Sequence, residues 1–536
     1  MNMNTINKLE NKIIEFKEKL TDAQKMAFLS AILLGLLAHG FALFNRLSVH
    51  DNSHCLFALG STYEVNRWGL GIIEDIQKMT TKMWSLPLFN GFLSIVFIAI
   101  GAMILVKIFN VQSKLVSAII GGLMVAFPMV TSSFSFMFTS WPYFLGLMIV
   151  ISAGYYMTRG LSVKNFIIAT LLLSFGISFY QTFLGVMITI LLLDMFVKVV
   201  DDKYDSVIDY IKTGVIYLLN LGLGLAIWSV VAKAFRTIKH IPLLSYKGLS
   251  DSYDVAQFPN LLVNALKAFF SFRMGGINHL RYLRAFSMLI FVITVVMIVL
   301  LLWKSKSKLS IKIFSLVGLA FMPIGMVVVY LLSTSELYAV TTMMLYAEVF
   351  VYIIPLVLLQ KIDGFEGKVS NFVAQGTSLL IILCTAVMTF GYVYLDNAAY
   401  VKASIMQEQA VVYSTALLAN IKSAEGFSDD LEVVIVGFNN VQDKTINEVG
   451  AKEEMEGVQL EKYYNSLEEM INFGVNIQFL RDHIGIGNDK LRVEDPVNEE
   501  PVVSNMSEVK KMPCYPNEGS IAIIDDMLVV KMGELE

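Results

Sequence analysis

The chain has 536 residues, of which 56% are hydrophobic and 16% charged, and its mean hydropathy is +0.63. A soluble chain carries roughly 25% charged residues, so most of this chain is suited to lipid rather than to water. This composition excludes a cytosolic enzyme, a secreted disulfide-bonded scaffold and a disordered chain. Cys55, Cys384 and Cys514 are too few and too scattered for a disulfide framework or a cysteine-rich metal site.

The charge is distributed unevenly along the chain. Residues 396–536 contain 11 Lys and Arg against 26 Asp and Glu, a net charge of −15, whereas residues 1–395 have a net charge of +11. An acidic tail that follows a basic, apolar body indicates two separate units. The positive charge lies between apolar runs rather than on one soluble face, which argues against nucleic acid as a partner.

In chain order, the predicted elements begin with a charged helix over residues 5–22, so we expect residues 1–23 to lie on the inner membrane surface. Eleven apolar runs follow, each about long enough for a transmembrane helix. They cover residues 24–44, 88–107, 115–133, 140–157, 164–179, 182–198, 212–232, 285–303, 312–332, 342–360 and 373–395. The first run is too long, and lies too far from the N-terminus, for a cleaved signal peptide. The predicted fold is an all-α polytopic membrane protein with about eleven transmembrane helices over residues 24–395.

Lys and Arg in the short loops predict the orientation, because cytoplasmic loops are enriched in positive charge. If the N-terminus is cytoplasmic, 13 Lys and Arg lie in or beside the loops that face inward, and none lies in the short loops that face outward. We therefore expect loops 45–87 and 233–284 and the tail 396–536 to be extracytoplasmic.

The acidic tail is predicted to form a small soluble α/β domain. Its sequence pattern predicts helices over 398–422 and 461–473, a buried strand over Leu431–Val436, and a hairpin of Ser520–Ile524 and Met527–Lys531. The turn of this hairpin is expected at Asp525-Asp526. Residues 489–512 are expected to form an acidic loop.

The first outer loop begins with a cluster of polar side chains. His50, Asp51, Asn52 and His54 directly follow the first membrane helix, where a carboxylate or an imidazole would be partly desolvated and its basicity adjustable. Asp51 is the candidate general base, and the two histidines are its competitors. The alternative is that these are ordinary polar residues at a helix end.

The same loop contains a second candidate group. Ser61-Thr62-Tyr63-Glu64 resembles a capping box that opens a helix, and this helix would carry Arg67 and Trp68. Its apolar side would lie flat in the membrane interface. If the substrate is a lipid phosphate, Arg67 is the candidate in this loop for binding the phosphate.

The second outer loop contains eight Lys and Arg, including Arg273 and Arg281. The partner of this charge is either lipid headgroups or a phosphate-bearing lipid substrate. Gly275 and Gly276, beside Arg273, would let the backbone approach a ligand closely. We expect Arg67 to lie near Arg273 or Arg281 at the outer surface.

Polar residues within apolar runs are candidates because they are costly in lipid. Asp194 lies near the inner end of its helix and is expected to reach water. Glu348 lies about two turns from the outer end of its helix and is a candidate for binding substrate. Tyr180 and Gln181, at an outer turn, either bind a sugar or anchor the interface. Sequence motifs for a P-loop or a zinc site are absent, so no metal ligands are assigned.

The order and spacing of these motifs resemble the bacterial glucosyltransferase II family, whose membrane proteins decorate surface polysaccharides. The resemblance extends over roughly residues 25–425. The segments that carry it are His50-Asp51-Asn52, Asn66-Arg67-Trp68-Gly69, Tyr180-Gln181-Thr182-Phe183 and Asp396-Asn397-Ala398-Ala399-Tyr400.

The resemblance implies a GT-C architecture, a polyprenyl-phosphate sugar donor and a cell-surface glycan acceptor at the outer face of a bacterial cytoplasmic membrane. It also implies that an outer-loop carboxylate is the catalytic base, which here is Asp51, with His50 and Asn52 beside the substrate. The family tends to carry an acidic pair, and this chain has Asn52 as the second member. No cofactor is required, because arginines can stabilise a leaving monophosphate, and a divalent metal is left open.

Two other classes of protein fit the same features. A transporter or flippase for a lipid-linked or anionic substrate would use the basic loops and Glu348 without chemistry. A membrane-anchored receptor would use the acidic tail to bind a partner. Release of sugar from a labelled polyprenyl-phosphate donor distinguishes the enzyme from both.

Overall fold

The structure is a computed structural model that describes residues 3–48, 50–53, 55–244, 255–272, 281–332, 340–362, 368–437, 490–494 and 502–533. The chain divides into two compact units. The first comprises Met1–Phe44 and Phe57–Asn397, and the second comprises Asn45–Leu56 and Ala398–Glu536. The sequence alone did not predict that the short segment Asn45–Leu56, which contains Asp51, belongs with the C-terminal unit.

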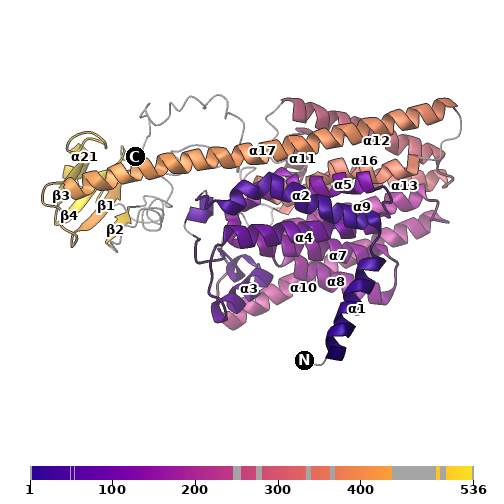
Figure 1. The fold of residues 1–536 in the computed structure, drawn as a ribbon, viewed down its shortest axis with the longest axis horizontal. Coiled ribbons are helices and arrows are strands. Elements are labelled where there is room, and N and C mark those ends of the chain that lie inside the picture. Colours follow the sequence, from indigo (N-terminus) through magenta and orange to yellow (C-terminus); the bar gives the residue numbers. More distant parts are fainter. Residues whose placement is uncertain are drawn as a thin grey trace. The chain divides into compact units, whose positions relative to one another are not determined.

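The first unit is helical (Figure 1). Its α-helices are α1 (Met3–Lys19), α2 (Asp22–Phe44), α3 (Trp68–Met79), α4 (Pro87–Ile108), α5 (Lys114–Ala126), α6 (Pro128–Ser133), α7 (Met137–Thr158), α8 (Val163–Ile177), α9 (Leu184–Val200), α10 (Val207–Lys239), α11 (Phe258–Phe270), α12 (Arg281–Lys304), α13 (Leu309–Ala320), α14 (Met322–Met326), α15 (Val329–Leu332), α16 (Phe350–Ile362) and most of α17 (Lys368–Ser423). The short 3₁₀ turns that matter below are η2 (Tyr63–Val65), η4 (Gln181–Phe183), η8 (Thr342–Met344) and η9 (Tyr346–Val349).

Eight helical stretches of the described residues are long and apolar enough to cross a membrane, so the predicted all-α polytopic fold is confirmed. They are Asp22–Phe44, Pro87–Ile108, Lys114–Thr158, Gln181–Val200, Val207–Lys239, Arg281–Lys304, Leu309–Met326 and Ala374–Ser423. The number is lower than eleven because Lys114–Thr158 contains two of the predicted runs, and because α8 and α16 are only 15 and 13 residues long.

Two of the predicted helices are interrupted. The run 312–332 divides into α13, α14 and α15, with Pro323 in the first turn of α14, where its missing N–H is tolerated. The run 342–360 begins with η8 and η9, and α16 starts only at Phe350. Glu348 therefore lies in a 3₁₀ turn before the helix, and its predicted place two turns inside a helix is wrong.

Small residues allow the first helices to pack closely, as is typical of helix contacts in membranes. α2 packs against α4 and α5. A Cβ added at Gly121 of α5 would lie 2.2 Å from the carbonyl oxygen of Ala27, and one at Gly35 of α2 would lie 2.8 Å from both Ile95 and Val125. Ala27, Ile95 and Val125 are fully buried, so these close contacts lie in the interior of the first unit.

The second unit contains a four-stranded sheet, which confirms the predicted small mixed α/β region. Its strands are β1 (Glu432–Val436), β2 (Leu491–Val493), β3 (Ile521–Ile524) and β4 (Met527–Lys531), in the order β2-β1-β4-β3. β1 is parallel to β2 and β4, whereas β3 and β4 form the predicted antiparallel hairpin. Asp525 and Asp526 both have positive φ, as a tight hairpin turn requires.

Two features of this unit differ from the prediction. Residues 489–512 are not simply a loop, because they contain β2 and the short helix α21 (Ser507–Lys511). The predicted helix 398–422 is the end of α17, which continues without a break for 56 residues. No Gly or Pro occurs between Tyr392 and Ala424 to end this helix. The predicted helix 461–473 lies outside the described residues.

Candidate functional site

The candidate site of the first unit begins at a left-handed residue. Asn66 ends η2 with φ of 63°, and α3 starts two residues later at Trp68, with Arg67 as its N-cap residue. Asparagine tolerates this conformation better than most residues. The sharp change of direction places Arg67 between a 3₁₀ turn and a helix.

Two side chains of α10 hold Asn66 in place. Trp228 donates its Nε1–H to the Asn66 carbonyl at 3.1 Å, and Arg236 donates from Nε to Asn66 Oδ1 at 3.0 Å. Arg236 is one of the eight basic residues assigned to the second outer loop from sequence. The structure gives it a local partner at the base of the Arg67 turn.

Arg67 lies against two stacked tyrosines, which we call the tyrosine pair (Tyr143 and Tyr180). Nη1 of Arg67 donates to the Tyr143 hydroxyl at 3.0 Å, and Cζ lies 5.7 Å from the Tyr143 ring and 5.4 Å from the Tyr180 ring. The two rings stack at 4.5 Å with an angle of 14°. A guanidinium this close to aromatic faces gains cation–π stabilisation, which holds Arg67 in one orientation.

Gln181 joins the same group. Its Nε2 donates to the carbonyl of Val65 at 3.0 Å, so η4 is tied to the turn that presents Arg67. The structure thus brings together three residues that the sequence singled out separately: Arg67, Tyr180 and Gln181. Tyr143 was missed, because a tyrosine in an apolar run gives no signal until its long-range partner is known.

The capping prediction needs correction. Thr62 makes no side-chain cap to η2, and the helix that carries Trp68 begins six residues after Thr62. The Thr62 hydroxyl instead donates to Glu74 Oε2 at 3.0 Å, within α3, while its backbone N–H donates to Glu64 Oε1 at 2.9 Å. The motif links the loop to α3 from the side rather than opening the helix.

A second polar network fixes α3 to α10. The Tyr63 hydroxyl donates to Asp75 Oδ2 at 2.7 Å, and Lys239 pairs with the same oxygen at 2.8 Å. Burial raises the pKa of Tyr63, and the hydrogen bond to Asp75 adds to this rise. Burial also acts to raise the pKa of Asp75, but the bonds from Lys239 and Tyr63 outweigh it and lower that pKa. The carboxylate therefore stays ionised and forms an ion pair with Lys239.

Glu348 is only 2% exposed and lies in η9. η9 packs against η4, where the rings of Tyr346 and Phe183 meet edge to face at 6.1 Å. The segment that carries Glu348 is therefore beside the segment that carries Gln181. The structure supports grouping these two predicted residues, although it does not test their roles.

The remaining predicted phosphate ligands are not tested. Arg281 is exposed at the start of α12, and Arg273 and the two glycines after it lie outside the described residues. The prediction that either arginine approaches Arg67 stays a prediction.

Asp51 belongs to the second unit. It lies in the 3₁₀ turn η1 (His50–Ser53), its side chain is half-buried, and its carbonyl accepts the N–H of Cys55 at 2.8 Å. Asn52 is buried, whereas His54 and the side chain of His50 lie outside the described part of the chain. Burial, with a contribution from Asp51, raises the pKa of the Cys55 thiol to about 12, so this thiol stays protonated at neutral pH.

Asp396 lies in a segment that carried the resemblance, and it too is buried, at 1% exposure. The Thr131 hydroxyl donates to one of its carboxylate oxygens, and the neighbouring Asn397 donates to the Leu37 carbonyl at 3.0 Å. These contacts connect α17 with α6 and α2 in the first unit. Sequence reasoning gave Asp396 no role of its own.

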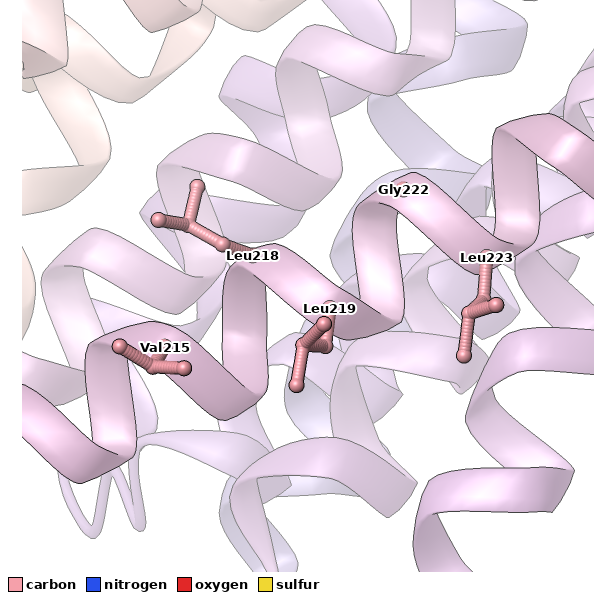
Figure 2. A pocket seen from close by; sticks show the side chains of 5 residues that line it. All are labelled: Val215, Leu218, Leu219, Gly222 and Leu223. Carbon is pink, nitrogen blue, oxygen red and sulfur yellow. The ribbon is translucent and has the colours of Figure 1, made fainter.

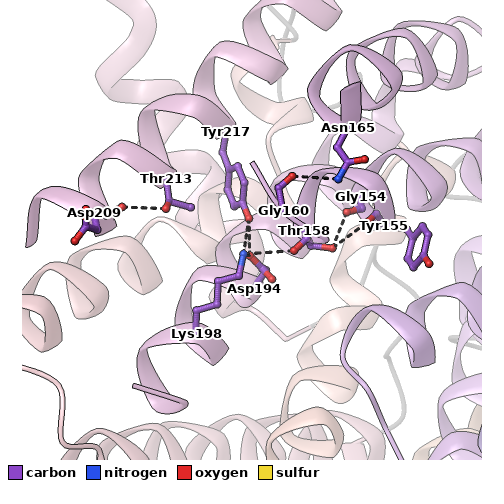
Figure 3. A network of polar contacts seen from close by, with 10 residues as sticks. All are labelled: Gly154, Tyr155, Thr158, Gly160, Asn165, Asp194, Lys198, Asp209, Thr213 and Tyr217. Carbon is purple, nitrogen blue, oxygen red and sulfur yellow. Dashed lines mark hydrogen bonds and ion pairs between the residues drawn. The ribbon is translucent and has the colours of Figure 1, made fainter. Parts of the chain in front are cut away.

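Asp194 has an internal partner, and the expectation that it reaches water is wrong. Oδ2 of Asp194 pairs with Lys198 at 2.7 Å and accepts from the Tyr217 hydroxyl at 2.5 Å (Figure 3). Lys198 and Thr158 connect this group to α7. The arrangement joins α9 to α10 and accounts for the charge structurally.

One cavity lies on α10, with a volume of about 310 Å³, and apolar side chains alone line it (Figure 2). Its lining is Val215, Leu218, Leu219, Gly222 and Leu223. None of the predicted site residues contributes to it. Among the described residues there is also no group of His, Cys, Asp or Glu suited to a metal ion.

The fold and the Arg67 group define a multi-pass membrane protein in which an arginine is held rigidly where a loop enters a helix. The family model described as Glucosyl transferase GtrII matches residues 40–352, more than half of the chain, and the chain belongs to this family. Membership makes the protein a glycosyltransferase, as the resemblance implied. No curated protein and no solved structure matches the chain significantly.

Proposed function

We propose that the protein transfers a hexose, glucose by family, from a polyprenyl-phosphate donor to a cell-surface glycan at the outer face of a bacterial cytoplasmic membrane. The observation that carries this proposal is the Arg67 group. A cation donates to the Tyr143 hydroxyl at 3.0 Å and lies against two aromatic rings, at the positive end of the helix dipole of α3, which also favours an anion.

The chemistry follows from the donor. The acceptor hydroxyl oxygen attacks the anomeric carbon, the bond from that carbon to the phosphate oxygen breaks, and polyprenyl phosphate leaves. We assign to Arg67, with Arg273 or Arg281, the stabilisation of charge on the leaving phosphate. Because the guanidinium is already oriented before the donor binds, little reorganisation is needed as this charge develops.

Asp51 is proposed as the general base that takes the proton of the acceptor hydroxyl in an inverting transfer. A carboxylate also stabilises the positive charge that develops on the sugar ring, whereas an imidazolium would oppose it. His50 and Asn52 flank Asp51 in the sequence, Gln181 follows Tyr180, and Glu348 lies in η9, which packs against η4. These four side chains, with Tyr180, are proposed to bind the sugar and the acceptor.

The test is turnover of a labelled polyprenyl-phosphate glucose by the purified protein in detergent. Asp51→Asn keeps the shape of the side chain and removes its basicity, so the rate should fall by roughly 10²–10⁴ while the protein still folds. Wild-type turnover by Asp51→Asn, combined with loss in His50→Gln or Glu64→Gln, would show that the base is misassigned. Because detergent removes the membrane barrier, sugar release also separates this enzyme from a transporter or flippase.

A further inference from the structure

Within the second unit, Gln407 of α17 forms hydrogen bonds with the segment that leads to Asp51. Oε1 of Gln407 accepts the backbone N–H of Ser48 at 2.8 Å, and Nε2 of the same side chain donates to the backbone carbonyl of Arg46 at 3.1 Å. One amide thus holds both a donor and an acceptor of the loop. Ser48, at 1% exposure, lies three residues before Asp51.

The loop needs such a partner. Residues 46–48 belong to neither a helix nor a strand, so their backbone groups have no regular ladder to pair with. Ser48 is buried, and a buried backbone N–H must be paired. Arg46 is exposed, and its carbonyl anchors the other half of the amide. A glutamine amide serves both functions, because it offers one acceptor and one donor side by side. Glutamate has the same reach but lacks the donor, and leucine has neither.

We propose that Gln407 is a positioning residue for the reaction, acting by fixing the loop that carries Asp51. This inference rests on the proposed function, because it takes Asp51 as the base. It gives the C-terminal half of α17 a part in catalysis, although Gln407 itself touches neither donor nor acceptor. Displacement of a catalytic group by about 1 Å can cost on the order of 10²-fold in rate.

The kinetic test compares three variants of the full-length protein. Gln407→Leu loses both hydrogen bonds and should lower kcat by about 10–100-fold, with the KM for the donor within about twofold of wild type, because uniform donor binding is unchanged. Gln407→Glu keeps the hydrogen bond from the Ser48 N–H, so its kcat should lie between the kcat of Gln407→Leu and that of wild type. The matched control is Glu408→Gln, an exposed neighbour on the same helix, which should keep wild-type turnover.

A double variant separates positioning from general destabilisation. If Gln407 acts through Asp51, adding Gln407→Leu to Asp51→Asn should slow the enzyme no further. The inference would be overturned if the loss of kcat in the double variant equals the product of the losses in the two single variants. A raised KM for the donor in Gln407→Leu would also overturn it. So would wild-type turnover by Gln407→Leu while Asp51→Asn is inactive, and in that case the proposed function stands. Wild-type turnover by Asp51→Asn would remove the base assignment and this inference with it. Should Gln407→Leu fail to fold, Gln407→Glu carries the same comparison.

Discussion

Arg67 is distinguished from the other cations of the outer loops by what surrounds it. Its guanidinium stacks against the tyrosine pair and donates to the Tyr143 hydroxyl, whereas Arg236 is occupied by Asn66 and Lys239 by Asp75. The cations of the two outer loops therefore differ: Arg236 and Lys239 hold local structure, whereas Arg67 is oriented by the tyrosine pair. The geometry and not the charge makes this distinction.

The Arg67 assignment can be tested by substitution. Arg67→Ala should lower kcat/KM by an amount that corresponds to a loss on the order of 2–5 kcal/mol in transition-state binding. The kcat/KM of Arg67→Lys should lie between those of Arg67→Ala and wild type, because lysine keeps the charge but lacks the planar fork. Steady-state kinetics with the labelled donor measure both. Lys233→Ala, an exposed cation near the end of α10, is the control. If Arg67→Ala remains within about twofold of wild type, Arg67 does not bind the phosphate.

At this scale the sequence predicted the candidates but not their partners. Arg67, Tyr180 and Gln181 stand out because polar residues near apolar runs are costly unless they have a use. Arg67 reaches Tyr143 across 76 residues, Gln181 reaches Val65 across 116, and Arg236 reaches Asn66 across 170. Contacts over such separations depend on the packing of whole helices, so no local pattern contains them.

Among the elements, α3 is positioned by a close approach at its first turn. The N–H of Gly69 donates to the Ser178 carbonyl at 3.2 Å, and a Cβ at Gly69 would lie 2.2 Å from Ser178 Oγ and 3.2 Å from the Phe179 ring. There is no room here for a larger residue. The position of the start of α3, and therefore of Arg67, requires a glycine at residue 69.

Gly69→Ala should therefore destabilise the protein by about 1–3 kcal/mol, the usual cost of overpacking, and should lower turnover because Arg67 shifts with α3. Gly222→Ala is the matched control, since a Cβ there meets nothing within 4 Å. In a helix interior that change should stabilise by roughly 0.5–1 kcal/mol. Thermal inactivation of the detergent-purified variants measures both, and equal shifts in the two would contradict the predicted contact.

In the second unit, Glu494 directly follows β2 and accepts three backbone N–H groups, from Val502 at 2.6 Å, Val503 at 2.7 Å and Ser504 at 2.7 Å. Burial opposes ionisation of Glu494, but the hydrogen bonds from Ser504, Val503 and Val502 outweigh burial and lower its pKa. Its stabilising effect is therefore complete above the unfolded pKa of about 4.3. The effect is lost as the pH falls through the folded value.

Hydrogen exchange at residues 502–504 tests this interaction. At pH 7, Glu494→Gln should exchange these amides about 10–100-fold faster than wild type, because bonds to a charged acceptor are the strong ones. The two proteins should converge as the pH is lowered through the folded pKa of Glu494. A difference that stays constant over this range would show that the charge is not what holds the loop.

Long apolar runs made the helices predictable, and the alternation around Asp525-Asp526 made the hairpin predictable. The break in 342–360 was not, because the 3₁₀ turns there depend on tertiary partners such as the Met124 carbonyl that binds Tyr346. The break in 312–332 was missed although Pro323 marks it. The short strand β2 was missed because three residues carry too little pattern. The type of each long element could be predicted from the sequence, whereas the interruption in 342–360 depends on how the chain packs.

For the whole molecule, the concentration of Lys and Arg in the short loops assigned to the inner side predicts that the acidic tail lies outside the cytoplasm. A reporter that is active only outside, fused after Glu536, should be active, and one fused in the loop between α9 and α10 should be silent. The enzymatic activities of these fusions in intact cells are the measurement. Activity of a cytoplasmic reporter at Glu536 would reverse the orientation and move Asp51 to the wrong face for the proposed donor.

Residues 340–349 have a consequence for how the protein is made. They are buried throughout, yet they form only η8 and η9. Backbone without a regular helix is tolerated at membrane depth only where it is buried in protein or lines a water-filled cavity. Tyr346 finds its partners in the Met124 carbonyl and the Phe127 ring, which the ribosome delivers more than 200 residues earlier. We therefore expect this stretch to enter the membrane only after α5 is in place beside it, so its insertion depends on a segment made much earlier.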